Sequence, residues 1–162
     1  SDTIIWAKDR FTLGRSDYQR QYEPMLYGWR EGTHHFWCGA RDQGDVWFVN
    51  KPQANFLHPT QKPVELVERA IRNSSKTRDT ILDVFGGSGT TLIACEKTGR
   101  ICYGMELAPE YVDVIVKRWQ EFTGREATLD GDGCTFEQAK FGRRLGAQDA
   151  IKEEVLECAA TR

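Results

Sequence analysis

Asp83-Val84-Phe85-Gly86-Gly87-Ser88-Gly89-Thr90-Thr91 is the stretch that decides the fold of this chain. The apolar, β-branched run Thr80–Phe85 predicts a short buried strand, and Thr90–Cys95 predicts the start of a helix. A glycine turn between a strand and a helix lets a ligand approach bare backbone at the positive end of the helix dipole. The stretch therefore predicts an α/β unit with a ligand site at this turn, unless it is only a tight turn that binds nothing.

Two ligands that commonly use such a turn fit it poorly. A phosphate-binding P-loop has the pattern GxxxxGK[ST], but the positions after Gly86 that should hold Gly-Lys hold Thr91-Leu92. A dinucleotide site has the pattern GxGxxG, and no glycine follows Gly87-Ser88-Gly89 at the required offset. Neither a phosphate nor a dinucleotide site is favoured.

A second carboxylate is expected at the same edge of the sheet. Ile101–Glu106 predicts the next strand, and Glu106 lies 23 residues after Asp83. In a strand–helix–strand unit the two parallel strands lie side by side, so both carboxylates reach the edge that carries the turn. Glu106 could accept both hydroxyls of a ribose there. Asp83 suits a cationic amino-acid end better than a pyrophosphate, which it would repel.

These residues, with His58-Pro59-Thr60-Gln61-Lys62-Pro63 ahead of them, resemble motifs X, I and II of the DNA amino-methyltransferases. Those enzymes use S-adenosylmethionine (SAM) to modify adenine N6 or cytosine N4, and the motif order here is that of their β group. Phe11–Tyr18 and Tyr22–Trp29 resemble the motif VIII region and the strand after it. The resemblance covers residues 3–124.

The resemblance implies an α/β fold, namely a class I SAM-dependent methyltransferase (Rossmann-like) sheet of seven strands. The chain offers candidates for four of them, at Thr3–Ala7, Glu23–Trp29, Thr80–Phe85 and Ile101–Glu106, and Ala127–Leu129 could be a fifth. Asp45–Val49 predicts a further short strand, and Pro109 starts a predicted helix with an apolar stripe. The central strands, strands 4 and 5 of the family order, have no candidate, so a partial sheet with unpaired edges and exposed apolar surface is expected. Residues 1–124 would be the SAM-binding portion. Residues 125–162 would be a C-terminal extension, partly helical or flexible, with a capping box at Thr135–Gln138 and a helix at Ala150–Cys158.

The resemblance also implies which residues contact SAM. Glu106 would accept the ribose hydroxyls, and Leu107 would lie against the adenine ring. Thr60 and Lys62 would contact the amino-acid end, although a solvated lysine at a helix start is the alternative for Lys62. The residues expected around the methionine part are Asp83, Phe85, Gly86, Gly87, Ser88, Gly89 and Thr90.

The catalytic tetrapeptide of this family, [DNS]PP[YFW], is absent, because all five prolines of the chain are isolated. No catalytic residue is therefore expected in this chain. It is expected to be the cofactor-binding part of a SAM-dependent DNA methyltransferase, completed by another segment or chain. A non-catalytic SAM-binding or regulatory subunit and an inactive decayed fragment are the alternatives. Adenine is favoured over cytosine as the target on family frequency alone.

Double-stranded DNA is the expected macromolecular partner. Basic and aromatic side chains in the region resembling motif VIII suit contacts to phosphates and bases, although a solvated hairpin face gives the same pattern. The net charge of −2 gives DNA binding no support. The candidate DNA contacts are Arg10, Arg15, Tyr18 and Arg20.

The chain is 162 residues long, which suits a single domain with one core of ordinary size. The five cysteines form no CxxC pair, and Cys95 and Cys102 are expected to be small buried apolar residues. His34, His35 and Cys38 lack a fourth metal ligand at a suitable spacing, so no metal is expected. No signal peptide and no apolar run of membrane-spanning length is found, so a cytoplasmic protein of bacterial or phage origin, without membrane contact, is expected.

Overall fold

The computed structural model describes residues 1–52 and 61–142. Thr60 and the helix expected at Ala150–Cys158 lie outside the described residues. The chain divides into two units, Ser1–Trp119 and Gln120–Arg162.

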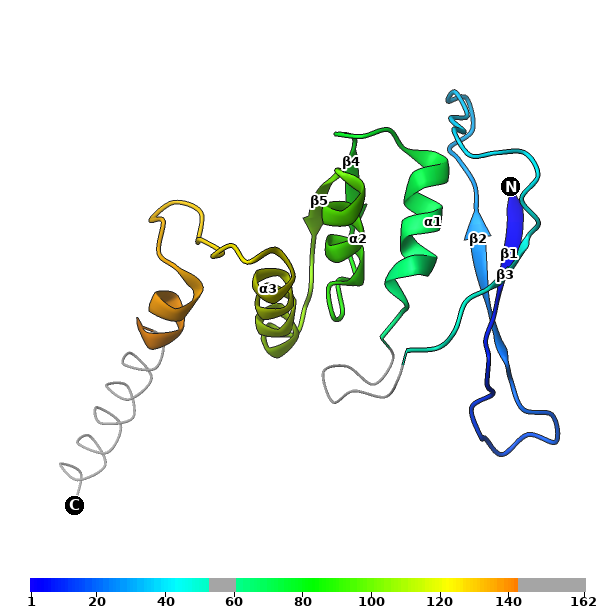
Figure 1. Ribbon diagram of the computed structural model, residues 1–162, viewed down its shortest axis with the longest axis horizontal. Coiled ribbons are helices and arrows are strands. Elements are labelled where there is room, and N and C mark those ends of the chain that lie inside the picture. The colour runs from blue at the N-terminus through cyan, green and yellow to red at the C-terminus, as the bar shows by residue number, and fades with distance from the viewer. Residues whose placement is uncertain (53–60, 143–162) are drawn as a thin grey trace, which may run out of the picture. The chain divides into compact units, whose positions relative to one another are not determined.

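Three strands near the N-terminus form one sheet in the order β2-β1-β3 (Figure 1). They are β1 (Asp2–Ala7), β2 (Tyr22–Tyr27) and β3 (Val46–Phe48). β1 pairs antiparallel with β2 and parallel with β3, where Trp6 lies opposite Trp47. Strands were predicted in all three places, and this prediction is confirmed.

The glycine turn belongs to a second sheet, made of two parallel strands. β4 (Thr80–Asp83) pairs with β5 (Ile101–Gly104), and α2 (Thr90–Thr98) connects them. α2 ends at Gly99, which has a positive φ of 69° and lets the Arg100 amide donate to the Cys95 carbonyl at 2.9 Å. The predicted strand–helix–strand unit is confirmed, but each strand ends two residues earlier than predicted.

α1 (Val64–Ser74) lies between the two sheets and contributes to both cores (Figure 1). Leu66 packs with Trp6 and Trp47, whereas Ile71 packs with Ala94 and Cys95. Val64, Val67 and Ile71 share one side of the helix and face the second core, whereas Leu66 lies on another side and faces the first. Cys95 is 1% exposed, as predicted, and burial raises the pKa of its thiol to about 12.

The opposite side of both sheets is largely bare. Strand residues alternate between two faces, so Ile81 packs against the helices while its neighbour Leu82 is 67% exposed. Leu26 on β2 is 90% exposed, and Tyr103 on β5 is exposed as well. Within residues 1–52 and 61–142, β2 and β4 each pair with a single strand. Apolar surface and open strand edges therefore occur together, as expected for a partial sheet.

α3 (Pro109–Thr123) carries the predicted apolar stripe, but the stripe is only partly covered. No residue of α3 is fully buried, and Val112 is exposed. α3 begins in the first unit and ends in the second.

The second unit contains a local turn and a helical segment. Thr128 forms an isolated antiparallel bridge with Thr135, so the sheet strand predicted at Ala127–Leu129 is wrong. The predicted capping box is confirmed: the Gln138 amide donates to Thr135 Oγ1 at 3.4 Å, and the Thr135 amide donates to Gln138 Oε1 at 2.9 Å. Residues 136–142 are helical.

Candidate functional site

The parallel pairing of β4 and β5 continues beyond the strands and brings Glu106 to the glycine turn. The Met105 amide donates to the Asp83 carbonyl at 2.8 Å, and the Gly86 amide donates to the Met105 carbonyl at 2.8 Å. Glu106 then accepts hydrogen bonds from the amides of Gly87 at 2.7 Å and Ala108 at 3.0 Å. The expectation that Asp83 and Glu106 reach the same edge of the sheet is confirmed.

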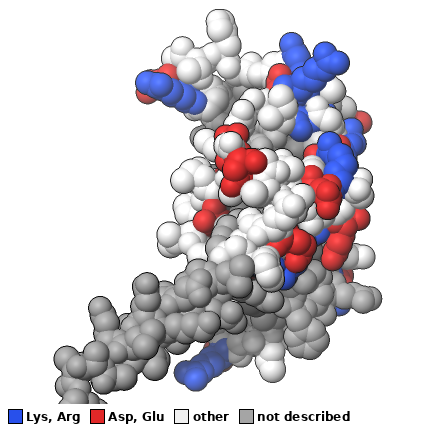
Figure 2. Space-filling model, turned by 90° about the vertical axis from the view of Figure 1, so that its left-hand side faces the viewer, with Lys and Arg blue, Asp and Glu red and all other residues white. Residues whose placement is uncertain are grey.

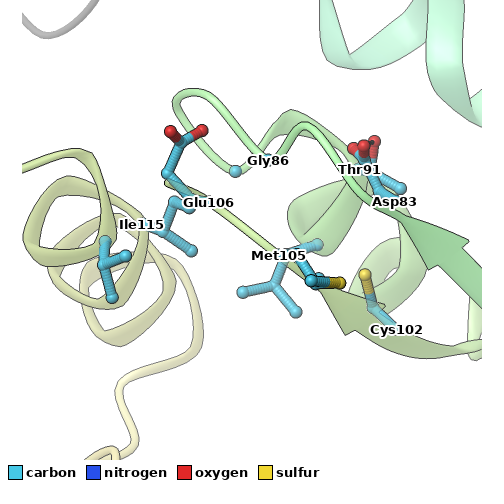
Figure 3. A pocket seen from close by; sticks show the side chains of 11 residues that line it. Asp83, Gly86, Thr91, Cys102, Met105, Glu106 and Ile115 are labelled. Atoms are coloured by element: carbon cyan, nitrogen blue, oxygen red, sulfur yellow. Dashed lines mark hydrogen bonds between the residues drawn. The ribbon is translucent and has the colours of Figure 1, made fainter. Parts of the chain in front are cut away.

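Asp83 shapes the other side of the turn. Its Oδ1 accepts a hydrogen bond from the Phe85 amide at 3.0 Å, and its Oδ2 accepts one from Thr91 Oγ1 at 2.6 Å. Figure 3 shows Glu106 near Gly86, with the Asp83 and Thr91 side chains next to each other. The two carboxylates thus hold the turn from both ends.

The glycines are required by the backbone. Gly87 and Gly89 have positive φ angles of 54° and 76°, which side chains disfavour. A Cβ on Gly86 would lie 3.0 Å from Ile115 Cδ1 and 3.2 Å from the Met105 carbonyl oxygen. The turn is therefore packed closely against α3 and the residue that follows β5.

Two cavities adjoin the turn. One, of about 210 Å³, extends between β5 and α3 and is lined by residues that include Cys102, Met105 and Ile115 (Figure 3). The other, of about 180 Å³, lies on the side of Gln61 and Lys62. Asp83, Gly86 and Thr91 line both cavities.

The segment before α1 forms a wall of the second cavity. Thr90 Oγ1 donates to the Lys62 carbonyl at 3.2 Å, which ties this segment to the turn. Gln61 Oε1 is buried, and no donor from residues 1–52 or 61–142 reaches it. A buried acceptor without a donor is costly, so this oxygen fits a ligand group that donates a hydrogen bond.

The Lys62 ammonium points to a different partner from the predicted one. It forms an ion pair with Glu23 Oε2 at 2.8 Å, while Lys8 pairs with Glu23 Oε1 at 2.7 Å. Burial raises the pKa of Glu23, but the hydrogen bonds from Lys62 and Lys8 outweigh it and leave the pKa lowered overall. The sequence pattern gave no sign of this cluster, because its members come from the end of β1 (Lys8 follows it), from β2 and from the segment before α1.

The remaining predicted cofactor residues divide into exposed and buried ones. Phe85 and Leu107 are 87% and 98% exposed, so their side chains are accessible to a ligand. Ser88 and Thr90 are buried within the turn. Arg118 of α3 contacts both of them, at the Ser88 carbonyl (2.9 Å), Ser88 Oγ (3.2 Å) and Thr90 Oγ1 (3.3 Å). Sequence reasoning missed Arg118, because only the fold brings it to the turn.

The candidate DNA contacts lie between β1 and β2. Arg15, Tyr18 and Arg20 are exposed, and Tyr18 is 93% exposed. Arg10 instead donates to the backbone carbonyls of Lys51 (3.2 Å) and Pro52 (2.9 Å). A role of these residues in DNA binding stays a prediction.

Two of the three residues considered for a metal, His35 and Cys38, have other partners. Cys38 Sγ donates to backbone carbonyls at the end of α1, including that of Arg72 at 2.9 Å. His35 is hydrogen-bonded to Tyr27 and stacks on Trp29 at a centroid distance of 4.1 Å. Among residues 1–52 and 61–142 there is no cluster of metal-ligating side chains.

The helices in the described part of the chain include none with the length and hydrophobicity of a membrane span.

Comparison with known proteins shows which family the chain is similar to. A family profile described as "DNA methylase" matches residues 1–117. Similar curated proteins include the Type II methyltransferases M.Cfr9I of Citrobacter freundii and M2.LlaDCHI of Lactococcus lactis subsp. cremoris. The first is 42% identical over 82 residues, which are 51% of this chain and 27% of M.Cfr9I. The second is 33% identical over 120 residues, which are 73% of this chain and 41% of M2.LlaDCHI. The chain thus spans less than half the length of these relatives.

Solved structures share the fold. The M1.HpyAVI–SAM complex is 28% identical, with a TM-score of 0.64 over 74% of this chain and 61% of that one. TTHA0409 of Thermus thermophilus, complexed with S-adenosyl-L-methionine, is 25% identical, with a TM-score of 0.54 over 82% of this chain and 54% of that one.

Proposed function

Since the chain belongs to the DNA amino-methyltransferase family, we propose that it is the cofactor-binding part of a SAM-dependent DNA methyltransferase. The predicted family and the predicted fold class, a partial class I methyltransferase sheet, are confirmed. The activity, substrate and partners of the whole enzyme are part of the proposal, because the chain covers only a fraction of its relatives.

The observation that carries the proposal is the glycine turn with a carboxylate at each end. We assign the ribose hydroxyls to Glu106, a carboxylate that the amides of Gly87 and Ala108 hold at the turn. The N-terminus of α2, which begins at Thr90, suits the carboxylate of the amino-acid end. Asp83 and the unpaired Gln61 Oε1 suit its ammonium group. The residues at the turn thus fit the amino acid and the ribose of SAM.

The other proposed contacts follow from the positions of their side chains near the turn. The exposed Leu107 would cover the adenine ring, and Phe85 would lie beside the methionine part. Thr60 and Lys62 are proposed at the amino-acid end. For Lys62 this requires its ammonium to leave Glu23, or its backbone to make the contact. Bound SAM supplies an electrophilic methyl group. The role of these residues is to bind and orient the cofactor, which accounts for much of the catalysis of a direct transfer.

The catalytic half is proposed to come from a complementary segment or chain. The bare faces at Leu26, Leu82 and Tyr103, and the open edges of β2 and β4, support this. Such a segment would pair its strands with these edges and contribute the [DNS]PP[YFW] tetrapeptide, which holds the extruded target base.

Double-stranded DNA, with adenine favoured over cytosine, is the proposed substrate. On the face shown in Figure 2, basic and acidic side chains are interspersed, so this face is not a continuous basic surface. We place the DNA contacts instead at Arg10, Arg15, Tyr18 and Arg20, in the segment between β1 and β2. A bacterial or phage-infected cytoplasm is the proposed location.

Reconstitution tests the proposal. The chain is mixed with an upstream segment that carries a [DNS]PP[YFW] tetrapeptide, and transfer of the radiolabelled methyl group of SAM to DNA is measured. Methylation is expected from the mixture and from neither part alone. The matched control replaces the aromatic residue of the tetrapeptide by alanine, which should abolish transfer without preventing assembly.

The outcomes separate the alternatives. Methylation by the chain alone would contradict the proposed division of the active site. SAM binding without methylation by the assembled mixture would favour a non-catalytic, regulatory subunit instead. The absence of both would favour a decayed fragment.

A further inference from the structure

Arg118 reaches the glycine turn from α3. Its Nη1 contacts two residues of the turn, at both oxygens of Ser88 and at the hydroxyl of Thr90. Ser88 and Thr90 are 4% and 7% exposed, so these contacts are shielded from water. Hydrogen bonds from a charged donor in such surroundings are stronger than those between neutral groups.

The contacts join three separate segments of the chain, two of which line the second cavity. Because Thr90 Oγ1 accepts a hydrogen bond from Arg118, its own proton is directed to the Lys62 carbonyl, 3.2 Å away. Arg118 therefore connects α3, the turn and the segment before α1. These parts lie far apart in sequence, and the turn and the segment before α1 together line the second cavity.

The charge of Arg118 is also unusual for its position. In the part of the chain that the structure describes, no carboxylate forms an ion pair with it. Burial lowers the pKa of its guanidinium, since the charged form loses hydration. The positive end of the α2 dipole lies at the same turn, beginning at Thr90. Two positive groups that converge without a paired anion favour a negative group of a ligand at this place.

We propose that Arg118 is a positioning residue that holds the glycine turn in its binding shape and adds positive charge opposite the carboxylate of the cofactor's amino-acid end. The inference rests on the proposed function and assigns Arg118 no part in the chemical step. Its specific consequence is that Arg118 matters for ligands that carry the amino-acid end and not for those that lack it.

Two ligands that differ in this end provide the test. S-adenosylhomocysteine has the amino-acid end, and 5′-methylthioadenosine lacks it, while both share the adenosine part. Arg118→Met is expected to weaken S-adenosylhomocysteine about tenfold and to change 5′-methylthioadenosine less than about twofold, as measured by calorimetry on the full chain. Arg118→Lys should restore part of the loss because it keeps the charge. Lys117→Met, an exposed position on the same helix, is the matched control and should change neither affinity.

Equal losses for both ligands, or no loss for either, would overturn the proposal. If the unmodified chain binds neither ligand, the proposed function itself is contradicted. A second measurement then still tests the positioning role of Arg118. Amide hydrogen exchange of the ligand-free chain should then be faster at Gly86–Thr91 in Arg118→Met than in Lys117→Met. Unchanged exchange at the turn would overturn the positioning role.

Discussion

Replacing Glu106 by alanine is expected to weaken the binding of SAM about 100-fold. The variant removes the acceptor proposed for both ribose hydroxyls, and hydrogen bonds to a charged group contribute about 1.5–3 kcal/mol each. A total of about 3 kcal/mol corresponds to a factor of about 100 in Kd. The variant also frees the amides of Gly87 and Ala108, which loosens the turn. Calorimetric titration measures the change.

Two further variants separate the causes. Glu106→Gln keeps one acceptor oxygen and should lose less affinity than Glu106→Ala. Glu110→Ala, at an exposed position in the first turn of α3, removes a nearby negative charge and should leave binding unchanged. If Glu106→Ala binds SAM as well as the unmodified chain does, Glu106 is not the ribose acceptor.

Replacing Asp83 by alanine is expected to lower both stability and cofactor affinity. The Phe85 amide and the Thr91 hydroxyl would lose their acceptor, and the backbone between them carries the turn. The loss of these two bonds is expected to reduce the free energy of unfolding by about 2 kcal/mol. The affinity for SAM should fall at least tenfold, because the turn loosens and the acceptor proposed for the ammonium group disappears.

Asp79→Ala is the matched control for Asp83→Ala. Asp79 precedes β4 at its other end, and its Oδ2 accepts a hydrogen bond from the Lys76 amide at 2.8 Å. This variant should lose stability by a similar mechanism but keep its affinity for SAM. Urea unfolding and calorimetry measure the two quantities separately. Equal loss of affinity in both variants would show that Asp83 acts only through stability.

The glycine turn and its two carboxylates were predictable because their causes are local. Apolar runs, glycines and a helix start occur in a fixed order, and a parallel strand–helix–strand unit then brings Asp83 and Glu106 to one edge. The strand ends were less predictable. Asp83 bends the chain with its own side chain at Phe85, so β4 stops before the apolar run does.

Interactions between distant segments were not predictable from the pattern. In the sequence, Arg118 is a charged residue beside the apolar stripe of a helix, a common pattern that indicates no contact. Its contact with Ser88 forms only because α3 packs on the turn. The Glu23–Lys62 ion pair likewise depends on the packing of β2 against the segment before α1. The strand expected at Ala127–Leu129 failed because a nearer partner, Thr135, pairs with Thr128.

Titration of SAM into this chain, in parallel with Glu106→Ala, tests the central claim most directly. The claim is that the glycine turn and its carboxylates form a cofactor site. Saturable binding of one SAM per chain is predicted, with an affinity about 100-fold lower in Glu106→Ala. The absence of saturable binding to the unmodified chain, or equal binding by the two proteins, would contradict it.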